Sequence, residues 1–232
     1  MAGKLKAFFK SFTAFDIVYL SLSIPLLIVV SILCGSDVLT TIYSIIAVLG
    51  VFLLTKGNFA APILLLVAYC IYAYLSYRGA LFGETIIYCA LLIPIQIATI
   101  ITWFVKKKKD NNQFIIGKVR LGHFLIALTM AAVGGVGAYF LLRAFNTSQL
   151  ILSTITLVVS VLCNYFSLLK SEYAFIGFIL NNVLFALLWL LPLLQGQEFG
   201  LSVLPMVVSG VLFCLLNIKG LITWTKMKKQ QN

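Results

Sequence analysis

The sequence contains two related stretches, Pro94-Ile-Gln96-Ile-Ala-Thr-Ile-Ile-Thr102-Trp103 and Asn217-Ile-Lys-Gly220-Leu-Ile-Thr223-Trp224. In each stretch a carboxamide stands seven residues before a tryptophan, a threonine precedes that tryptophan, and lysines follow shortly after. A second pair of related stretches is Leu53–Ala60 and Ser167–Ala174, in which Lys56 pairs with Lys170. The two pairs have offsets of 121 and 114 residues, and we interpret them as the trace of an internal duplication.

Both stretches belong to a strongly apolar chain. Of its 232 residues, 62% are hydrophobic and 10% are charged, whereas a soluble domain is about half apolar and about one quarter charged. This composition excludes a water-soluble enzyme. A membrane-spanning helix needs about 20 predominantly apolar residues, and eight runs are long enough. These are Ala14–Cys34, Asp37–Leu54, Phe59–Tyr77, Glu84–Val105, Leu121–Leu142, Ser148–Leu169, Ala174–Leu194 and Leu201–Trp224.

The 17 lysines and arginines test this count, because positive charge concentrates in cytoplasmic loops. With eight spans and an inside amino terminus, only Arg78 and Arg143 lie outside, and Lys219 lies within the last span. All the others fall in the termini or in alternate loops, which are then cytoplasmic. We therefore predict a multi-pass protein of the plasma membrane with both termini in the cytoplasm. The net charge of +11 follows from this topology, and a nucleic acid partner is not expected.

The duplication predicts the architecture. Its unit is three helices, which are spans two to four and spans six to eight. Three crossings end on the opposite side of the membrane, so a second copy in the same orientation needs one additional crossing, which span five supplies. We predict an all-α integral membrane protein with a three-plus-one-plus-three parallel repeat behind one extra N-terminal helix, a plan known among transporters. The segments are 1–36, 37–105, a basic loop and linker helix at 106–147, and 148–232.

Carboxamides from three spans are expected at one depth. Trp103 and Trp224 are expected at the inner interface, because indole rings favour the headgroup level. Seven residues of helix then place Gln96 and Asn217 about 10 Å above it. Asn181 and Asn182 rise about as far from the inner start of span seven. An unpaired amide in hydrocarbon is costly, so these groups either bond to one another between helices or face a polar cavity.

Aromatic residues surround this level and form a candidate wall for a flat heterocycle. Stacking and cation–π contacts favour such a ligand, above all a cationic one. Each ring taken singly also suits lipid contact or ordinary packing, because 13% of the chain is aromatic. The candidates are Tyr69, Tyr72, Tyr88, Phe175 and Phe178.

Other chemistry is sparse in the sequence. Every Asp and Glu falls near an end of a span, so ion-coupled pumping has little to work with. The five cysteines are scattered singly, and His123 has no evident partner, so no metal site, cofactor or catalytic centre is expected. Facilitated diffusion is the economical mechanism. A non-transporting scaffold and an intramembrane enzyme are the alternatives from other classes, and homo-oligomerisation stays open.

Several motifs give the chain a family resemblance. The stretch Tyr72-Ala-Tyr74-Leu-Ser-Tyr77-Arg78, then Leu81-Phe-Gly83-Glu84, then Pro94-Ile-Gln96 and Trp103, resembles the PnuC vitamin transporters. Further matches are Lys56-Gly57-Asn58-Phe59, Asn182, Leu188-Trp189, Asn217, Gly220 and Trp224. The resemblance runs from about Asp37 to the carboxyl terminus, and the first span is not part of it.

The resemblance implies a seven-helix core like that of SWEET proteins and uniport of nicotinamide riboside or a related vitamin precursor. It further implies that a cytosolic kinase traps the arriving substrate, and that Gln96, Asn182 and Asn217 bind its ribose and carboxamide. The chain departs from the family pattern at Phe175 and Phe178, where a Trp-x-x-Trp pair is common, and at Tyr88, Leu91 and Leu92. Thiamine, riboflavin and deoxynucleosides therefore stay open as substrates on the same fold.

Overall fold

The computed structural model describes residues 12–79, 82–109, 114–147, 149–194 and 200–231. Parts of the predicted N-terminal tail, at 1–11, and of the basic loop, at 110–113, lie outside these ranges. The elements are α2 (Ala14–Leu33), α3 (Val38–Thr55), α4 (Ala61–Arg78), α5 (Phe82–Ile87), the π-helix η1 (Tyr88–Leu92), α6 (Ile93–Lys109), α7 (Leu121–Ala144), α8 (Leu150–Leu168), α9 (Tyr173–Leu194), the 3-10 helix η2 (Gly200–Val203) and α10 (Leu204–Gln231).

The predicted class is confirmed. Over the described ranges the structure is helical without strands, and it has eight helical segments that are long and apolar enough to cross a membrane. Their outward surfaces carry large exposed apolar side chains, including Ile32, Leu33 and Leu121. Such surfaces suit hydrocarbon and not water, so the chain is a multi-pass membrane protein.

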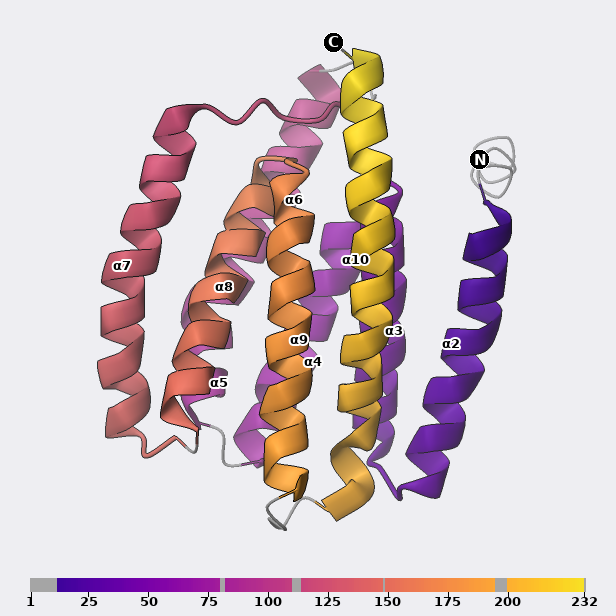
Figure 1. Ribbon diagram of the computed structural model, residues 1–232, viewed down its shortest axis with the longest axis vertical. Coiled ribbons are helices and arrows are strands. Elements are labelled where there is room, and N and C mark those ends of the chain that lie inside the picture. Colours follow the sequence, from indigo (N-terminus) through magenta and orange to yellow (C-terminus); the bar gives the residue numbers. More distant parts are fainter. Residues whose placement is uncertain (1–11, 80–81, 110–113, 148, 195–199, 232) are drawn as a thin grey trace.

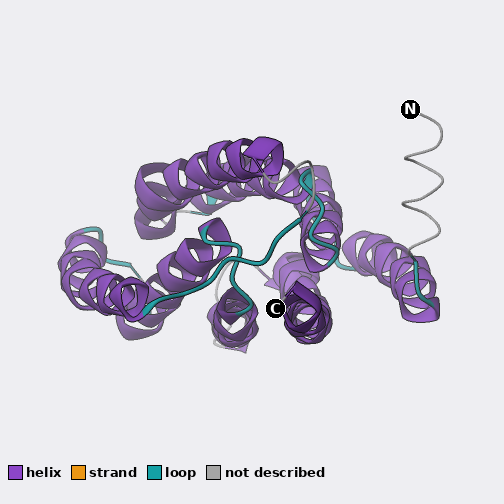
Figure 2. Ribbon diagram, turned by 90° about the horizontal axis from the view of Figure 1, so that it is seen from above, coloured by secondary structure: helices purple, strands orange, loops and turns teal. Residues whose placement is uncertain are grey.

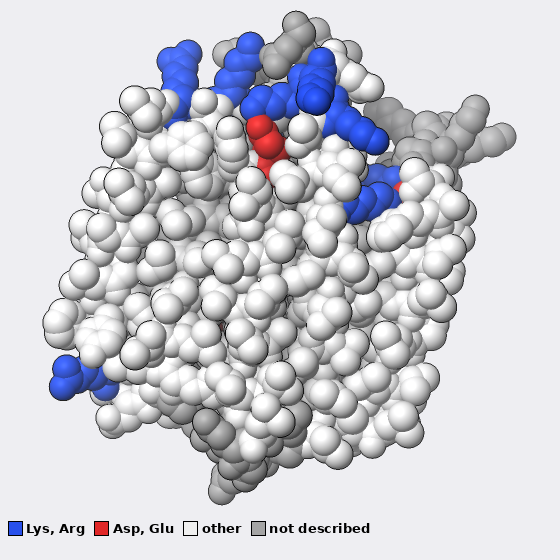
Figure 3. All heavy atoms as spheres, viewed as in Figure 1, with Lys and Arg blue, Asp and Glu red and all other residues white. Residues whose placement is uncertain are grey.

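The helices run along one common direction (Figure 1). Seen from above, α2 and α7 occupy opposite flanks of the bundle (Figures 1 and 2). The start of α2 and the end of α10 lie at the same end of the bundle (Figure 1). On the face shown in Figure 3, most lysines and arginines gather at that end, and the middle of this face is almost free of charged side chains. This one-sided distribution is what the loop charges in the sequence predict.

The fourth span differs from the prediction of one continuous helix over Glu84–Val105. It consists of α5, the π-helical turn η1 and α6, and the amide of Ile93 donates to the carbonyl of Tyr88, five residues back. Pro94 follows at once and has no amide hydrogen, so the regular bond at this position is missing and a wider turn forms. The π-helical turn brings Tyr88 and Leu92 to the cavity described below.

Two sets of helices make equivalent contacts. α3 packs on α4 as α8 packs on α9, and α10 lies against α3 as α6 lies against α8. The indole nitrogen of Trp103 donates to the carbonyl of Ser167 at 3.0 Å, and that of Trp224 donates to the carbonyl of Leu54 at 3.1 Å. Both tryptophans, which were expected at the inner interface, are fully buried between the helix sets and do not face lipid.

The backbone also corrects the offset between the two related loops. Within these two loops, the residues with left-handed φ are Gly57, at 62°, and Lys170, at 56°. The amide of each donates to the carbonyl three residues earlier at 2.9 Å. Equivalent positions are therefore 113 residues apart, and Lys170 corresponds to Gly57 instead of Lys56. The sequence suggested Lys56 as the counterpart of Lys170 because lysine is not the residue type that this backbone conformation favours, so the match to Gly57 was hidden.

Polar contacts tie the N-terminal helix α2 to the bundle. The carboxylate of Asp16 is fully buried, caps the helix through Thr13, and forms ion pairs with Lys56, at 2.5 Å, and Lys219. Tyr19 donates to the carbonyl of Leu212 at 2.9 Å. Burial lowers the pKa of Lys56, whereas the adjacent carboxylate favours its charged form. The two lysines come from the end of α3 and from α10, so these ion pairs attach α2 to both helices.

Candidate substrate-binding site

A cavity of about 70 Å³ lies within the bundle, and side chains of α3, α4, η1, α8, α9 and α10 line it. This volume is enough for several water molecules. Of the predicted site residues, the structure places six at the cavity: Tyr69, Tyr88, Phe178, Asn181, Asn182 and Asn217. The cavity also contains Tyr43, Ser160, Asn164, Phe185 and Phe213, which were not predicted.

The cavity has one apolar side and one polar side. Ala47, Val51 and Ala68 line it on α3 and α4. The residues 113 positions later on α8 and α9 are Ser160, Asn164 and Asn181, and these also line it. The duplicated positions thus present hydrocarbon on one side and hydrogen-bonding groups on the other. A ligand with one flat apolar face and one polar edge matches this arrangement.

Two of the lining carboxamides are held by the protein itself. Asn164 donates to the carbonyl of Ser160 at 2.8 Å and accepts from the hydroxyl of Tyr69 at 2.9 Å. Asn181 accepts from the hydroxyl of Ser160 at 2.7 Å. These bonds join α4, α8 and α9 across the cavity and fix the direction of the amides.

Asn182 and Asn217 retain hydrogen-bonding capacity. The amide nitrogen of Asn182 and the amide oxygen of Asn217 are buried and make no hydrogen bond within the described residues. Buried polar atoms without a partner are costly, and in native proteins they mark bound water or a ligand. With these amide orientations the two residues present one donor and one acceptor, which is the complement of a primary carboxamide.

Gln96 lies outside the cavity wall. Its amide nitrogen donates at 2.9 Å to the carbonyl of Pro62 on α4, and the side chain is 2% exposed. The depth estimate from the sequence placed Gln96 with Asn217, but the π-helical turn precedes it and changes the face that α6 presents. In this structure its amide nitrogen joins two helices of the first set and is not offered to a ligand.

Tyr72 and Phe175 also lie behind the wall. The ring of Tyr72 is buried against Tyr88, with centroids 4.4 Å apart, and Phe175 packs edge-on against Trp224 at 4.9 Å. Phe175 occupies space that Gly220 leaves free, since a Cβ on Gly220 would lie 2.2 Å from the ring. Tyr72 therefore supports Tyr88, which faces the cavity, and Phe175 supports Trp224 at the inner end.

This packing predicts that Gly220→Ala destabilises the protein. The added methyl group overlaps the fully buried Phe175 ring, and overpacking of this kind costs about 1–3 kcal/mol. Gly134→Ala on α7 is the matched control, because a Cβ there meets nothing within 4 Å. Thermal unfolding in detergent should show a lower midpoint for Gly220→Ala alone. Equal midpoints for the two variants would contradict the packing.

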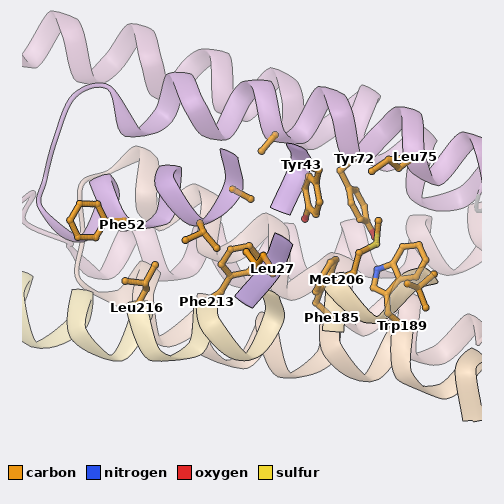
Figure 4. Close-up of a cluster of buried hydrophobic side chains, with 14 of the residues drawn as sticks. Leu27, Tyr43, Phe52, Tyr72, Leu75, Phe185, Trp189, Met206, Phe213 and Leu216 are labelled. Atoms are coloured by element: carbon orange, nitrogen blue, oxygen red, sulfur yellow. The ribbon is translucent and has the colours of Figure 1, made fainter. Parts of the chain in front are cut away.

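Aromatic rings close the cavity at its outer end, away from the termini. Tyr72, Phe185 and Trp189 come together there, as Figure 4 shows. The Tyr72 centroid lies 5.5 Å from that of Tyr43, 5.7 Å from Phe185 and 6.3 Å from Trp189. These rings stand between the cavity and the outer end of the bundle.

At the inner end of the cavity lie Trp103, Trp224 and the irregular segment 114–120, called the strap, which follows the basic loop. Phe114 packs at 5.2 Å from Trp103 and 5.0 Å from Trp224. The side-chain amide of Gln231 holds the strap by accepting from the amide of Ile116 and donating to the carbonyl of Phe114. The hydrophobic cluster around these tryptophans also includes Leu54, Leu65 and Phe178, and these three residues line the cavity as well. Aromatic clusters of the described residues thus lie at both ends of the cavity.

Catalytic and metal-binding chemistry has little support at this site. Among the described residues, no group of three or more His, Cys, Asp or Glu side chains is placed to hold a metal ion. The residues that line the cavity include no Lys, Arg, Asp, Glu or His. The cavity can bind by hydrogen bonds and ring contacts, and it lacks the acids, bases and charges that most hydrolytic or transfer reactions use.

The family model described as nicotinamide mononucleotide transporter matches residues 37–226, which span every helix that lines the cavity. The chain belongs to this family. It is thus a membrane transporter, and the resemblance found in the sequence is confirmed. The N-terminal helix α2 precedes the matched region.

Two comparisons with individual proteins agree with membership of the nicotinamide mononucleotide transporter family. The chain is 22% identical over 228 residues to the nicotinamide riboside transporter PnuC of Neisseria mucosa, which covers 97% of this chain and 86% of that protein. It also superposes on the crystal structure of the vitamin B3 transporter PnuC with a TM-score of 0.80, at 22% identity and over 96% of this chain and 95% of the other. The second comparison confirms the fold.

Proposed function

We propose that the protein is a uniporter for nicotinamide riboside or a closely related vitamin precursor, acting by facilitated diffusion. The observation that carries the proposal is the cavity with one unpaired amide donor and one unpaired acceptor beside aromatic rings. The carboxamide of nicotinamide supplies the matching acceptor and donor, and its ring fits between Tyr88 and Phe178. Ser160 and Asn164 then face the ribose.

The cavity favours the riboside over the mononucleotide named in the family description. A phosphate group carries about two negative charges and is normally bound by Arg, Lys or helix N-terminal amides. None of the cavity-lining residues is cationic. A nucleoside meets the polar side of the cavity with its hydroxyl groups and brings no phosphate charge into it.

The proposed mechanism uses the two helix sets as moving bodies. We take spans two to four (37–105) and six to eight (148–232) as copies of one unit, joined by the loop and α7 (106–147), with 1–36 as an extra helix. Their equivalent contacts and paired tryptophan hydrogen bonds support this. Rocking of the sets opens the inner or the outer aromatic cluster in turn. The charged end faces the cytoplasm of a plasma membrane protein in this proposal.

Net uptake in this proposal comes from metabolic trapping. The described carboxylates lie near helix ends, and no carboxylate faces the cavity, so the substrate site itself has no evident coupling group. A cytosolic kinase that phosphorylates the arriving nucleoside prevents its return, because the product carries charges that the cavity does not accommodate. Transport itself then only equilibrates the two sides.

Uptake into liposomes tests the proposed function. Labelled nicotinamide riboside should equilibrate across proteoliposomes, and it should accumulate when a riboside kinase and ATP are trapped inside. Nicotinamide mononucleotide should not enter. Riboflavin, thiamine and thymidine serve as competing substrates in the same assay. Uptake of one of these in place of the riboside, or accumulation that needs a proton gradient without kinase, would contradict the proposal.

A further inference from the structure

Glu84 differs from the other acidic residues that the structure describes. Asp16 pairs with Lys56 and Lys219, Asp37 pairs with Arg78, and Glu172 pairs with Lys228. Glu84 is 5% exposed and forms no ion pair with any described residue, and its Oε1 atom makes no hydrogen bond there. A buried carboxylate without an ion pair is costly, and such a group is a candidate for a functional role.

The position of Glu84 connects it with the cavity. It lies on α5, four residues before Tyr88, so the two side chains share one face of consecutive helical turns. Tyr88 lines the cavity, and its ring lies 4.4 Å from that of the buried Tyr72. The hydroxyl of Thr85 lies 3.4 Å from the carbonyl of Ala73, which holds α5 against α4. Glu84 thus stands about one turn outside the cavity, towards the outer end.

We propose that Glu84 selects for positively charged substrates by serving as their counter-charge between the outer opening and the cavity. This inference rests on the proposed function and specifies its substrate class as flat organic cations. The ring of nicotinamide riboside is a pyridinium and carries one positive charge. A cation passing the rings of Tyr72 and Tyr88 meets the carboxyl group that forms no ion pair with a described residue, and both gain from the contact.

The experiment compares two substrates of nearly equal shape. Nicotinamide riboside is a cation, and its dihydro form, which has gained a hydride on the ring, is neutral. For Glu84→Gln we expect kcat/KM for uptake of the cation to fall about tenfold or more, and that for the neutral form to change less than twofold. Glu84→Asp, which keeps the charge, should retain the preference for the cation even if its overall rate is lower.

Asp37→Asn is the matched control, because this outer carboxylate is exposed and already paired with Arg78. It should leave the ratio of the two substrates unchanged. A similar loss of both substrates in Glu84→Gln would overturn the inference and assign Glu84 a structural role or a role in proton transfer. An equal change of the ratio in Asp37→Asn would overturn it in favour of general surface charge. Wild-type protein that carries neither riboside would overturn the proposed function as well.

Discussion

Asn182→Leu and Asn217→Leu should each reduce kcat/KM for nicotinamide riboside by roughly 5- to 150-fold, as measured by uptake into proteoliposomes. Leucine has nearly the shape of asparagine, so the cavity keeps its size and loses one hydrogen-bonding group. The substrate amide is then left without a partner in a site closed to bulk water, which costs about 1–3 kcal/mol for each lost bond. The folded state should tolerate the change, because each side chain has an unpaired amide atom already.

The loss should be specific to the cavity. Asn146→Gly is the control, because Asn146 is exposed near the outer end of α7 with a left-handed φ of 49° that glycine adopts readily. Its uptake should equal that of the wild type. If both asparagine variants carried the riboside normally, the two amides would be bonded to water or to helices in the working protein, and the proposed site would be wrong.

Asp16→Asn should have the largest effect on stability. The carboxylate is fully buried and pairs with Lys56 and Lys219, whose side chains are only 13% and 19% exposed. Removing one member of a buried ionic network leaves the remaining charges without compensation, which costs about 3–5 kcal/mol. Thermal unfolding in detergent should therefore show a midpoint lower by several degrees.

Two further variants separate this network from general charge loss. Asp37→Asn removes a carboxylate from an exposed pair with Arg78, and such pairs contribute at most about 1 kcal/mol. The triple variant Asp16→Leu, Lys56→Met, Lys219→Met removes every charge of the buried network and should recover most of the lost stability. An Asp16→Asn midpoint as high as that of Asp37→Asn would show that the ion pairs of Asp16 do not hold α2 on the bundle.

The spans were predictable because crossing a bilayer imposes a length and an apolar composition on every helix. Three of the carboxamides that the sequence predicts at one depth, Asn181, Asn182 and Asn217, line the same cavity. Helical rise converts residue number into depth, so this part needs no knowledge of the neighbouring helices.

The direction of each side chain was harder to predict. The same depth argument included Gln96, whose amide nitrogen bonds to Pro62 on α4, and it overlooked Asn164, a carboxamide inside the sixth span that lines the cavity. Asn164 stands only four residues before the end of α8, and that position was a usable signal. Tyr43 carried no such signal, because tyrosines are frequent in this chain and suit lipid contact as well.

The sequence by itself determined the helical class, the eight spans, the common side of the charged loops and the family, since these follow from hydropathy, charge order and local motifs. Only the tertiary structure decided which carboxamides keep an unpaired atom, that Trp103 and Trp224 are buried between the helix sets, and that no described Lys or Arg pairs with Glu84. The reason is that depth depends on position along one helix, whereas a partner depends on how neighbouring helices are rotated. The π-helical turn before Pro94 sets that rotation for α6.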